Sequence, residues 1–360
     1  MSELKTNKIQ TNDTNNVSID NPLQLKSYTT TDRNALTSVA GDMIYNTTTS
    51  KVEYYDGSAW ASGVSAFQIQ FVIVAGGGSG SGIWGGANMA ASGAGAGGYV
   101  SNVTGENTGG GLSSTQTMYI APSTNYTVSI GAGGSASGSQ NQHSGYEGNP
   151  SYFNNITAEG GGAAQSYVQN HAKGRSIKGG SGAGRGSYIN HAGISTAGGD
   201  GLTGQGYDGG SVQQVYNGAA NAAGGGGGAS AAGGDGSSNN GGNGGAGVAT
   251  SISGSSVTYA GGGGGGAYST QGTGGAGGGA DGVKNANGNA GTANTGGGAG
   301  GLYITNTTAR YGGNGGSGIV ILRYPNTYTI SQSGLTISTA TTGNDKVTTI
   351  TAGTGTVSWS

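Results

Sequence analysis

Hydrophobic residues are concentrated in a few short segments of the 360-residue chain, and long glycine-rich and polar stretches separate these segments. The segment 67–75, FQIQFVIVA, alternates at first and is then continuously apolar, which predicts the strongest strand of the chain. The segment 318–324, GIVILRY, predicts a second apolar strand, and 117–121 and 125–130 predict two weaker ones. Because the first and the last of these strands enclose the glycine-rich stretch, we expect them to pair or to lie close together.

The two ends of the chain differ in composition from the glycine-rich middle. Residues 1–66 predict a β-rich stem, in which GDMIYNTTTSKVEYYDGSAW indicates a strand, a polar turn, a strand and a turn at Asp56-Gly57. Its apolar side chains supply too little surface for a monomeric domain, so we expect this stem to oligomerise. They are Met43, Ile44, Tyr45, Val52, Tyr54 and Trp60. Residues 325–360 are rich in Thr and Ser and predict a third module of three or four short strands.

Glycine decides the expectation for the middle of the chain. There are 85 glycines, and nearly all lie between residues 76 and 318, where Leu, Ile, Val and Phe are too scarce to form an ordinary core. Without a Cβ atom, chains can run as extended helices of three residues per turn, rising ~3.1 Å per residue, whose backbone groups bond to neighbouring chains. We therefore predict a mainly β protein with a polyglycine-II-type helix bundle over residues 67–324, framed by β-strands.

Composition and charge exclude several classes of protein. The chain has no cysteine, which excludes disulfides and thiolate metal or redox sites. A formal net charge of -2 argues against a nucleic-acid partner, and it predicts adhesion with little dependence on salt. The longest aliphatic stretch, residues 71–75, is too short to span a bilayer, and the first ten residues lack the apolar core of a secretory signal. We expect no membrane insertion.

Candidate chemistry is sparse. No lysine follows a glycine, which excludes the usual phosphate loop, and the aspartates are too irregularly spaced for a calcium β-roll. The three histidines do not have the spacing of metal ligands. A glycan-cleaving site needs two carboxyl groups about 5–9.5 Å apart. Glu147 and Asp208 could meet across loops, but nothing in the sequence indicates that they do. We therefore expect no enzymatic activity, no cofactor and no metal.

The segments between the glycine runs carry the candidate binding residues. The chain has 19 tyrosines against 3 phenylalanines and 3 tryptophans, and Tyr, Ser, Gly and Asn are typical of antibody combining loops. Each tyrosine either contacts a partner or fills a gap between glycine helices. Trp84 and Tyr99 adjoin the first glycine run and favour the packing role. The candidate receptor-contacting residues are His143, Tyr146, Tyr152, Tyr167, His171, Arg175, Tyr188, His191, Tyr216, Tyr268, Tyr303 and Tyr311.

An ordered set of motifs brings a resemblance. The succession FVIVAGGG, YTVSIGAGG, SSVTYAGGGGGG, NTGGGAGG and GGNGGSGIVILRYP resembles the glycine-rich domain of bacteriophage tail-fibre and virion-associated proteins, of the type common in marine and cyanobacterial phages. The stem and the Thr/Ser-rich tail also fit that family. More distantly, the chain is similar to tip adhesins of T-even-like phages, which alternate glycine-rich motifs with variable segments. That similarity implies a polyglycine-II sandwich with receptor-binding loops at its distal end.

The resemblance and the composition together give an expected function. We expect a tail-fibre tip protein on the virion, outside the cell, which binds a host-surface polysaccharide or outer-membrane protein without bond chemistry. Its other partners would be virion tail proteins, and residues 1–66 would form a homotrimer. One alternative is a purely structural shaft spacer, capsid decoration or filament subunit. Another is an ice- or surface-binding protein, but the interruptions are too irregular for the flat rows of Thr or Ala that this would need.

Overall fold

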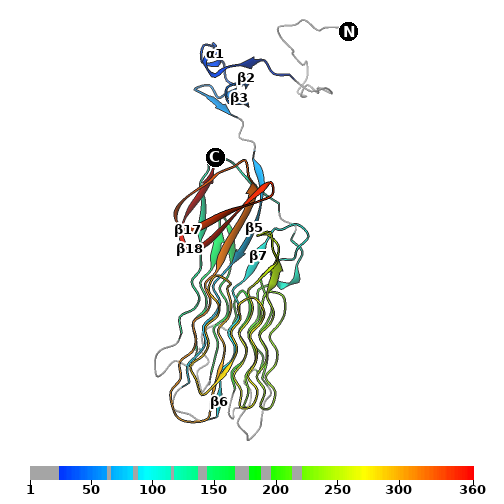
Figure 1. The fold of residues 1–360 in the computed structure, drawn as a ribbon, viewed down its shortest axis with the longest axis vertical. Coiled ribbons are helices and arrows are strands. Elements are labelled where there is room, and N and C mark those ends of the chain that lie inside the picture. The colour runs from blue at the N-terminus through cyan, green and yellow to red at the C-terminus, as the bar shows by residue number, and fades with distance from the viewer. Residues whose placement is uncertain are drawn as a thin grey trace. The chain divides into compact units, whose positions relative to one another are not determined.

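The fold is that of a computed structural model, which describes residues 24–62, 66–83, 88–114, 117–136, 144–166, 178–187, 196–212 and 221–360 (Figure 1). The chain divides into two compact units, Met1–Ser65 and Ala66–Ser360. The division lies one residue from the end that the sequence predicts for the stem.

The first unit is a small four-stranded sheet with one short helix. Its strands follow the order β1-β2-β3-β4, with β1 parallel to β2 and the other pairs antiparallel. Thr29 caps the helix, since its side chain accepts a hydrogen bond from the backbone N–H of Asp32. The elements are β1 Ser27–Tyr28, α1 Thr30–Asn34, β2 Met43–Asn46, β3 Lys51–Tyr55 and β4 Trp60–Ser62.

The buried face of this sheet is largely polar. Glu53 is 3% exposed, and its carboxylate accepts hydrogen bonds from Arg33 at 2.6 Å and from the Asn46 amide at 3.0 Å. Burial raises the pKa of Glu53, but hydrogen bonds from Asn46, Arg33 and Thr49 outweigh it, and the net pKa is lowered. Ile44 is the buried hydrophobic residue of the described part of this unit. A hydrogen-bonded network thus takes the place of an apolar core.

The second unit begins with a nine-stranded sheet that curls into a nearly closed barrel, here called the β framework. Its main path is β11-β10-β9-β18-β16-β5-β7, with β17 beside β18 and β8 beside β5. β5 and β16 pair antiparallel from Gln70–Arg323 to Val74–Ile319, which confirms the pairing expected from the sequence. The strands are β5 Phe67–Val74, β7 Tyr99–Ser101, β8 Met118–Ile120, β9 Tyr126–Ser129, β10 Ser151–Phe153, β11 Ile156–Ala158, β16 Ile319–Pro325, β17 Ile330–Thr342 and β18 Asp345–Trp359.

The C-terminal residues 325–360, for which the sequence predicts a short β module, form part of this framework. Two long strands replace the three or four short ones, and β18 pairs with β16 along its first half and with β9 along its second. Gly334 and Gly353 adopt φ angles of +76° and +104°, beside a register shift in the β17–β18 ladder. Such glycines bend a hairpin without ending it, so breaks in the sequence pattern became bulges inside continuous strands.

Side chains fill the interior of the framework. The cluster brings together residues that are 0–9% exposed from most of the strands, including Phe71, Phe153 and Leu322. Trp359 lies among four other rings, with centroids 5.7 Å from Tyr324 and 5.8 Å from Tyr126. Trp359 lies in β18, so the last strand of the framework completes the core that β5 begins.

The glycine-rich segments bond with a period of three, as polyglycine-II helices do. In the segment 93–98, Gly93 and Ala96 donate their backbone N–H groups to Gly224 and Gly227. The next pair, Ala94 and Gly97, donates to residues 299 and 296, and Gly95 and Gly98 donate to residues 162 and 159. Every third residue therefore donates to the same neighbour, and three further segments, which contain Gly78, Ser181 and Gly263, donate back to the carbonyl groups of 93–98. This ladder and the strands around it confirm the predicted fold class.

The same pattern recurs elsewhere in the bundle, and it explains why glycine is needed. Gly262 and Gly265 donate to residues 245 and 242, while Gly263 and Gly266 donate to residues 94 and 91. A Cβ atom at Gly263 would overlap the carbonyl oxygen of Ala299. Alanine occurs where helices leave room for methyl groups, as in the buried cluster of Ala94, Ala164 and Ala299.

The glycine-rich part of the chain also forms two small sheets of short strands. A hairpin joins β12 Val248–Thr250 to β13 Val257–Tyr259, and a three-stranded sheet has the order β14-β15-β6. Its strands are β6 Met89–Ala90, β14 Val283–Lys284 and β15 Leu302–Ile304. Figure 1 shows β6 near the end of the bundle that lies away from β17 and β18. We call this end the distal end. The η1 turn, Gly109–Gly111, follows β7.

Candidate functional site

A buried tyrosine organises the distal end. Tyr303 in β15 is 0% exposed and packs against Ala90 and Ala223. Its hydroxyl lies 3.1 Å from the side-chain oxygen of Asn221 and 3.3 Å from that of Asn88, so it can donate to either. A ring with a polar tip thus ties three separate stretches of chain together.

The ring of an exposed tyrosine contacts the ring of the buried one. Tyr268 is 45% exposed, and its ring meets that of Tyr303 edge-on, with centroids 5.9 Å apart. The Lys284 ammonium lies 4.2 Å from the centre of the Tyr268 ring and donates a hydrogen bond of 2.6 Å to the Tyr268 carbonyl oxygen. Ring contact, cation–π contact and hydrogen bond together hold Tyr268 in one orientation at the surface.

The polar groups beside these rings form a connected set. Burial is the main cause that raises the pKa of Tyr303 to about 12, and the neighbouring Tyr268 adds to the rise. The Tyr303 hydroxyl therefore stays protonated and can donate. The Asn221 amide nitrogen in turn donates to the side-chain oxygen of Asn239 at 3.0 Å. Residues Asn88, Asn221, Asn239, Tyr268, Lys284 and Tyr303 are called the distal cluster from here on.

The chain returns repeatedly to this end of the bundle. The Ser166 hydroxyl donates to the carbonyl oxygen of Gly82 at 3.0 Å, and the Ser187 hydroxyl donates to that of Ala90 at 3.1 Å. Ser166, Ser187, Asn88 and Asn221 each border a stretch outside the described residues, and those stretches hold Tyr167, Tyr188, Trp84 and Tyr216 among others. Their borders are thus gathered around the distal cluster.

The predicted binding residues are distributed unevenly over the structure. Tyr268 and Tyr303 lie together, with Tyr303 taking the packing role. Tyr311, 39% exposed, is joined at its backbone N–H to the Asn287 side chain at 3.1 Å. Tyr146 lies beside Ser79 in the bundle, and Tyr152 is half-buried in β10 of the framework. His143, Tyr167, His171, Arg175, Tyr188, His191 and Tyr216 lie outside the described residues.

The three asparagines and Lys284 of the distal cluster escaped the sequence reasoning. Asparagine is common throughout the inter-glycine segments, so these three carried no distinguishing signal. Lys284 stands alone at the edge of a two-residue strand, and only the fold shows that it lies over Tyr268. Their partners come from positions far away in the sequence, which no local pattern reports.

Within the part of the chain that the structure describes, no group of three or more His, Asp or Glu side chains could hold a metal ion. The described residues likewise include no helix long and apolar enough to cross a membrane.

Comparison with known proteins gives one match. A family model described as a glycine-rich domain matches residues 49–325, which include part of the first unit and the whole glycine bundle up to the end of β16. No curated protein and no solved structure matches the chain.

Proposed function

The chain belongs to the glycine-rich domain family, and from its structure we propose that it is a receptor-binding protein of a bacteriophage tail fibre. The glycine bundle is the scaffold, and the distal cluster with the segments bordering it is the contact surface for a molecule on the host cell. That molecule is a surface polysaccharide or an outer-membrane protein. The protein acts on the virion, outside the cell, by binding without bond chemistry.

The observation that carries this proposal is the fixed orientation of Tyr268 on a rigid support. An exposed ring that is already held by Tyr303 and Lys284 loses little rotamer freedom on contact. Tyrosine supplies a flat apolar face and a hydroxyl at low entropic cost, and the neighbouring asparagines supply adaptable hydrogen bonds. The glycine helices beneath bond to neighbours on all sides, as the donor and acceptor bonds of the segment 93–98 show, so the surface is displayed with little internal motion.

The first unit supports an attachment role through self-association. Met43 pairs across the β2–β3 ladder with Tyr54, and Tyr45 pairs with Val52. All four side chains are 37–55% exposed on one face, which is a large apolar area for so small a sheet. Covering this face with copies of the same unit would supply the apolar burial that its polar interior lacks. We propose a homotrimer that joins other virion tail proteins.

Binding of the labelled full-length chain to bacterial cells, with and without surface polysaccharide, tests the proposal. We expect saturable binding to a narrow set of strains, and a loss of about tenfold or more in affinity for Tyr268→Ala, since anchoring aromatic residues dominate interfaces. Tyr119→Ala is the matched control, because Tyr119 is 61% exposed on the framework strand β8.

The outcomes separate the proposal from its alternative. Folded protein that binds no strain, or a Tyr268→Ala variant that binds as tightly as the Tyr119→Ala control, would refute the distal cluster as a receptor surface. A structural spacer or decoration protein would then remain. The mass of the full-length chain in solution, by light scattering, tests the trimer independently of receptor binding.

A further inference from the structure

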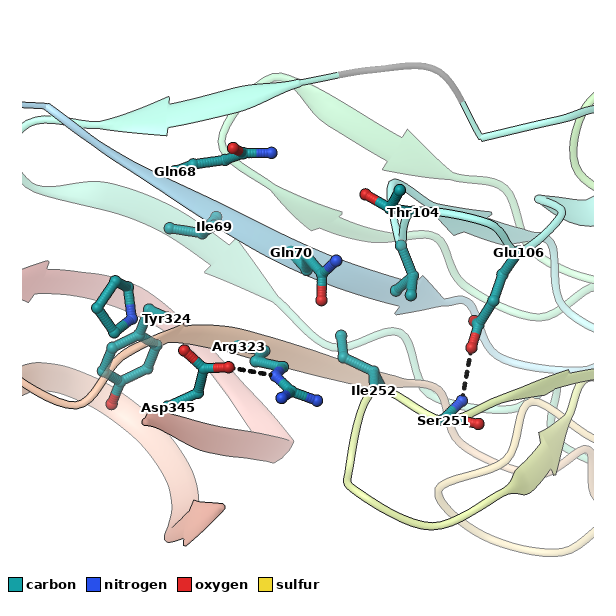
Figure 2. A pocket seen from close by; sticks show the side chains of 12 residues that line it. Gln68, Ile69, Gln70, Thr104, Glu106, Ser251, Ile252, Arg323, Tyr324 and Asp345 are labelled. Carbon is teal, nitrogen blue, oxygen red and sulfur yellow. Dashed lines mark hydrogen bonds and ion pairs between the residues drawn. The ribbon is translucent and has the colours of Figure 1, made fainter. Parts of the chain in front are cut away.

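A polar cleft lies at the other end of the second unit, on the β framework. It has a volume of about 590 Å³, within the usual range for small-ligand sites. Figure 2 shows its lining: β5 and β16 form the floor, the first residue of β18 lies at one side, and Glu106 and Ser251 lie at the other. Five separate stretches of sequence therefore build one concave surface.

The alternating half of β5 supplies two amides to this cleft. Phe67, Ile69 and Phe71 point into the framework core, whereas Gln68 and Gln70 point outward between them. The two glutamine side chains line the cleft, and they have no hydrogen-bond partner among the described residues. Each amide therefore offers both a donor and an acceptor to a ligand.

The floor continues onto the neighbouring strand. Arg323 of β16 lies directly opposite Gln70 in the ladder, and its Nε donates to the Asp345 carboxylate at 2.8 Å. This ion pair is partly exposed, and it neutralises the guanidinium charge while leaving the two terminal nitrogens without a protein partner among the described residues. Planar N–H groups whose charge is already balanced suit a neutral, oxygen-rich ligand.

The far wall is held in place by side-chain hydrogen bonds. The Asn102 side chain accepts from the Phe71 N–H at 2.6 Å and donates to the Ile69 carbonyl oxygen at 3.0 Å, which extends the ladder by one amide. The tight turn that follows has Gly105 at a φ of +81°, a conformation that favours glycine. It brings the Glu106 carboxylate to the backbone N–H of Ser251 at 2.7 Å, and this bond joins the turn to the β12–β13 loop.

Free hydrogen-bonding groups dominate the cleft, and a smaller apolar surface lies among them. The hydroxyls of Thr104 and Ser251 add to the two amides and the guanidinium, while partly exposed Pro325 supplies hydrocarbon beside the nearly buried Val103 and Ile252. Two carboxylates against one guanidinium make the lining slightly negative, which disfavours an anionic ligand. Sugar rings combine hydroxyls that both donate and accept with apolar C–H faces. We propose that this cleft binds a neutral saccharide, at a site separate from the distal cluster.

Calorimetric titration of the full-length chain with short oligosaccharides tests the site. The probes are neutral oligomers of glucose, galactose, mannose and N-acetylglucosamine, with a sialic-acid-containing and a uronic-acid-containing oligosaccharide as acidic comparisons. We expect saturable binding of at least one neutral series and weaker or no binding of the acidic ones. Gln70→Ala should weaken that binding about tenfold, and Thr104→Trp should abolish it by filling the cleft from its exposed rim.

Matched variants keep the test specific. Thr336→Trp places the same ring on an exposed position of β17, outside the cleft, and should bind like the unaltered chain. Tyr268→Ala should also leave saccharide binding unchanged, so failure of the receptor proposal and failure of the cleft proposal are distinguishable. Absence of binding for every neutral probe, preference for the acidic ones, or full binding by the Thr104→Trp variant would overturn the proposal.

Discussion

Two parts of the second unit hold together by opposite means. In the β framework, rings and branched side chains fill the interior. The ring centroid of Trp359 lies within 6.5 Å of the centroids of four other rings. In the glycine bundle, backbones touch, and the hydrophobic side chains buried around Ala94 are the methyl groups of Ala164 and Ala299. Removing atoms should therefore weaken the framework, and adding atoms should weaken the bundle.

The comparison also explains why the bundle needs so many bonds. Each backbone hydrogen bond stabilises a fold by only about 0.5–1.5 kcal/mol net, and each ordered glycine costs roughly 0.5–1 kcal/mol more than alanine. The interior helix 93–98 therefore bonds to six neighbours, three as donor and three as acceptor, whereas a strand of the framework bonds to two and gains apolar burial as well. Rigidity in the bundle follows from bond number, and in the framework from packing.

The largest expected effect is the loss of a framework ring. Trp359→Ala removes the ring that Phe67, Tyr126, Phe153 and Tyr324 surround, and should lower the free energy of unfolding by about 3–5 kcal/mol. Chemical denaturation followed by circular dichroism measures this change. Tyr119→Ala, on the framework surface, should change it by less than about 0.5 kcal/mol. Equal stability of the two variants would contradict the packing account of the framework.

A single added methyl group in the bundle should come next. Gly263→Ala places a Cβ against the carbonyl oxygen of Ala299, where backbone must move, and should cost about 1–3 kcal/mol. Gly343→Ala is the comparison, because Gly343 has a φ of +61° but no atom within 4 Å of an added Cβ. Its cost should be limited to the left-handed conformation, about 1–2 kcal/mol. Spectra of backbone amides should shift around residues 94 and 299 only in the Gly263→Ala variant.

Asn102 adds a third case to the comparison. Its side chain makes the two hydrogen bonds to β5 that backbone groups make elsewhere in the framework. Asn102→Ala leaves the buried N–H of Phe71 without its acceptor and should cost about 1–3 kcal/mol. Thr104→Ala, two residues away and exposed, should have almost no effect on unfolding. Hydrogen exchange at Phe71 measures the loss directly. Unchanged protection of that amide would show that the Asn102 bond is dispensable.

The smallest effect at neutral pH concerns Tyr303, whose hydroxyl also makes stability depend on pH above 10. Because its pKa is raised from 10.0 to about 12 in the folded chain, its contribution to stability is present below pH 10 and is lost as the pH rises through 12. Tyr303→Phe should remove this pH dependence and cost about 1 kcal/mol near neutral pH through the lost hydroxyl bonds. Denaturation between pH 8 and 12 measures both, and parallel curves for the two proteins would exclude the linkage.

The sequence by itself determined which kind of packing each region uses. Continuous apolar residues at 71–75 and 319–322 required buried strands, and their position around the glycine block indicated that they pair. The scarcity of bulky residues between them left close backbone packing as the remaining source of order. These are local properties of composition and period, which can be read without knowing any neighbour.

The tertiary structure alone decided which segments are neighbours. Residues 93–98 bond to six other segments of the chain, and glycine runs look alike, so nothing in them specifies those partners. The edge-on contact of Tyr268 with Tyr303 and the bond that joins Glu106 to Ser251 are likewise contacts between residues far apart in the sequence. A residue pattern records what each segment can bury, whereas binding surfaces arise where segments meet, and only the fold determines that meeting.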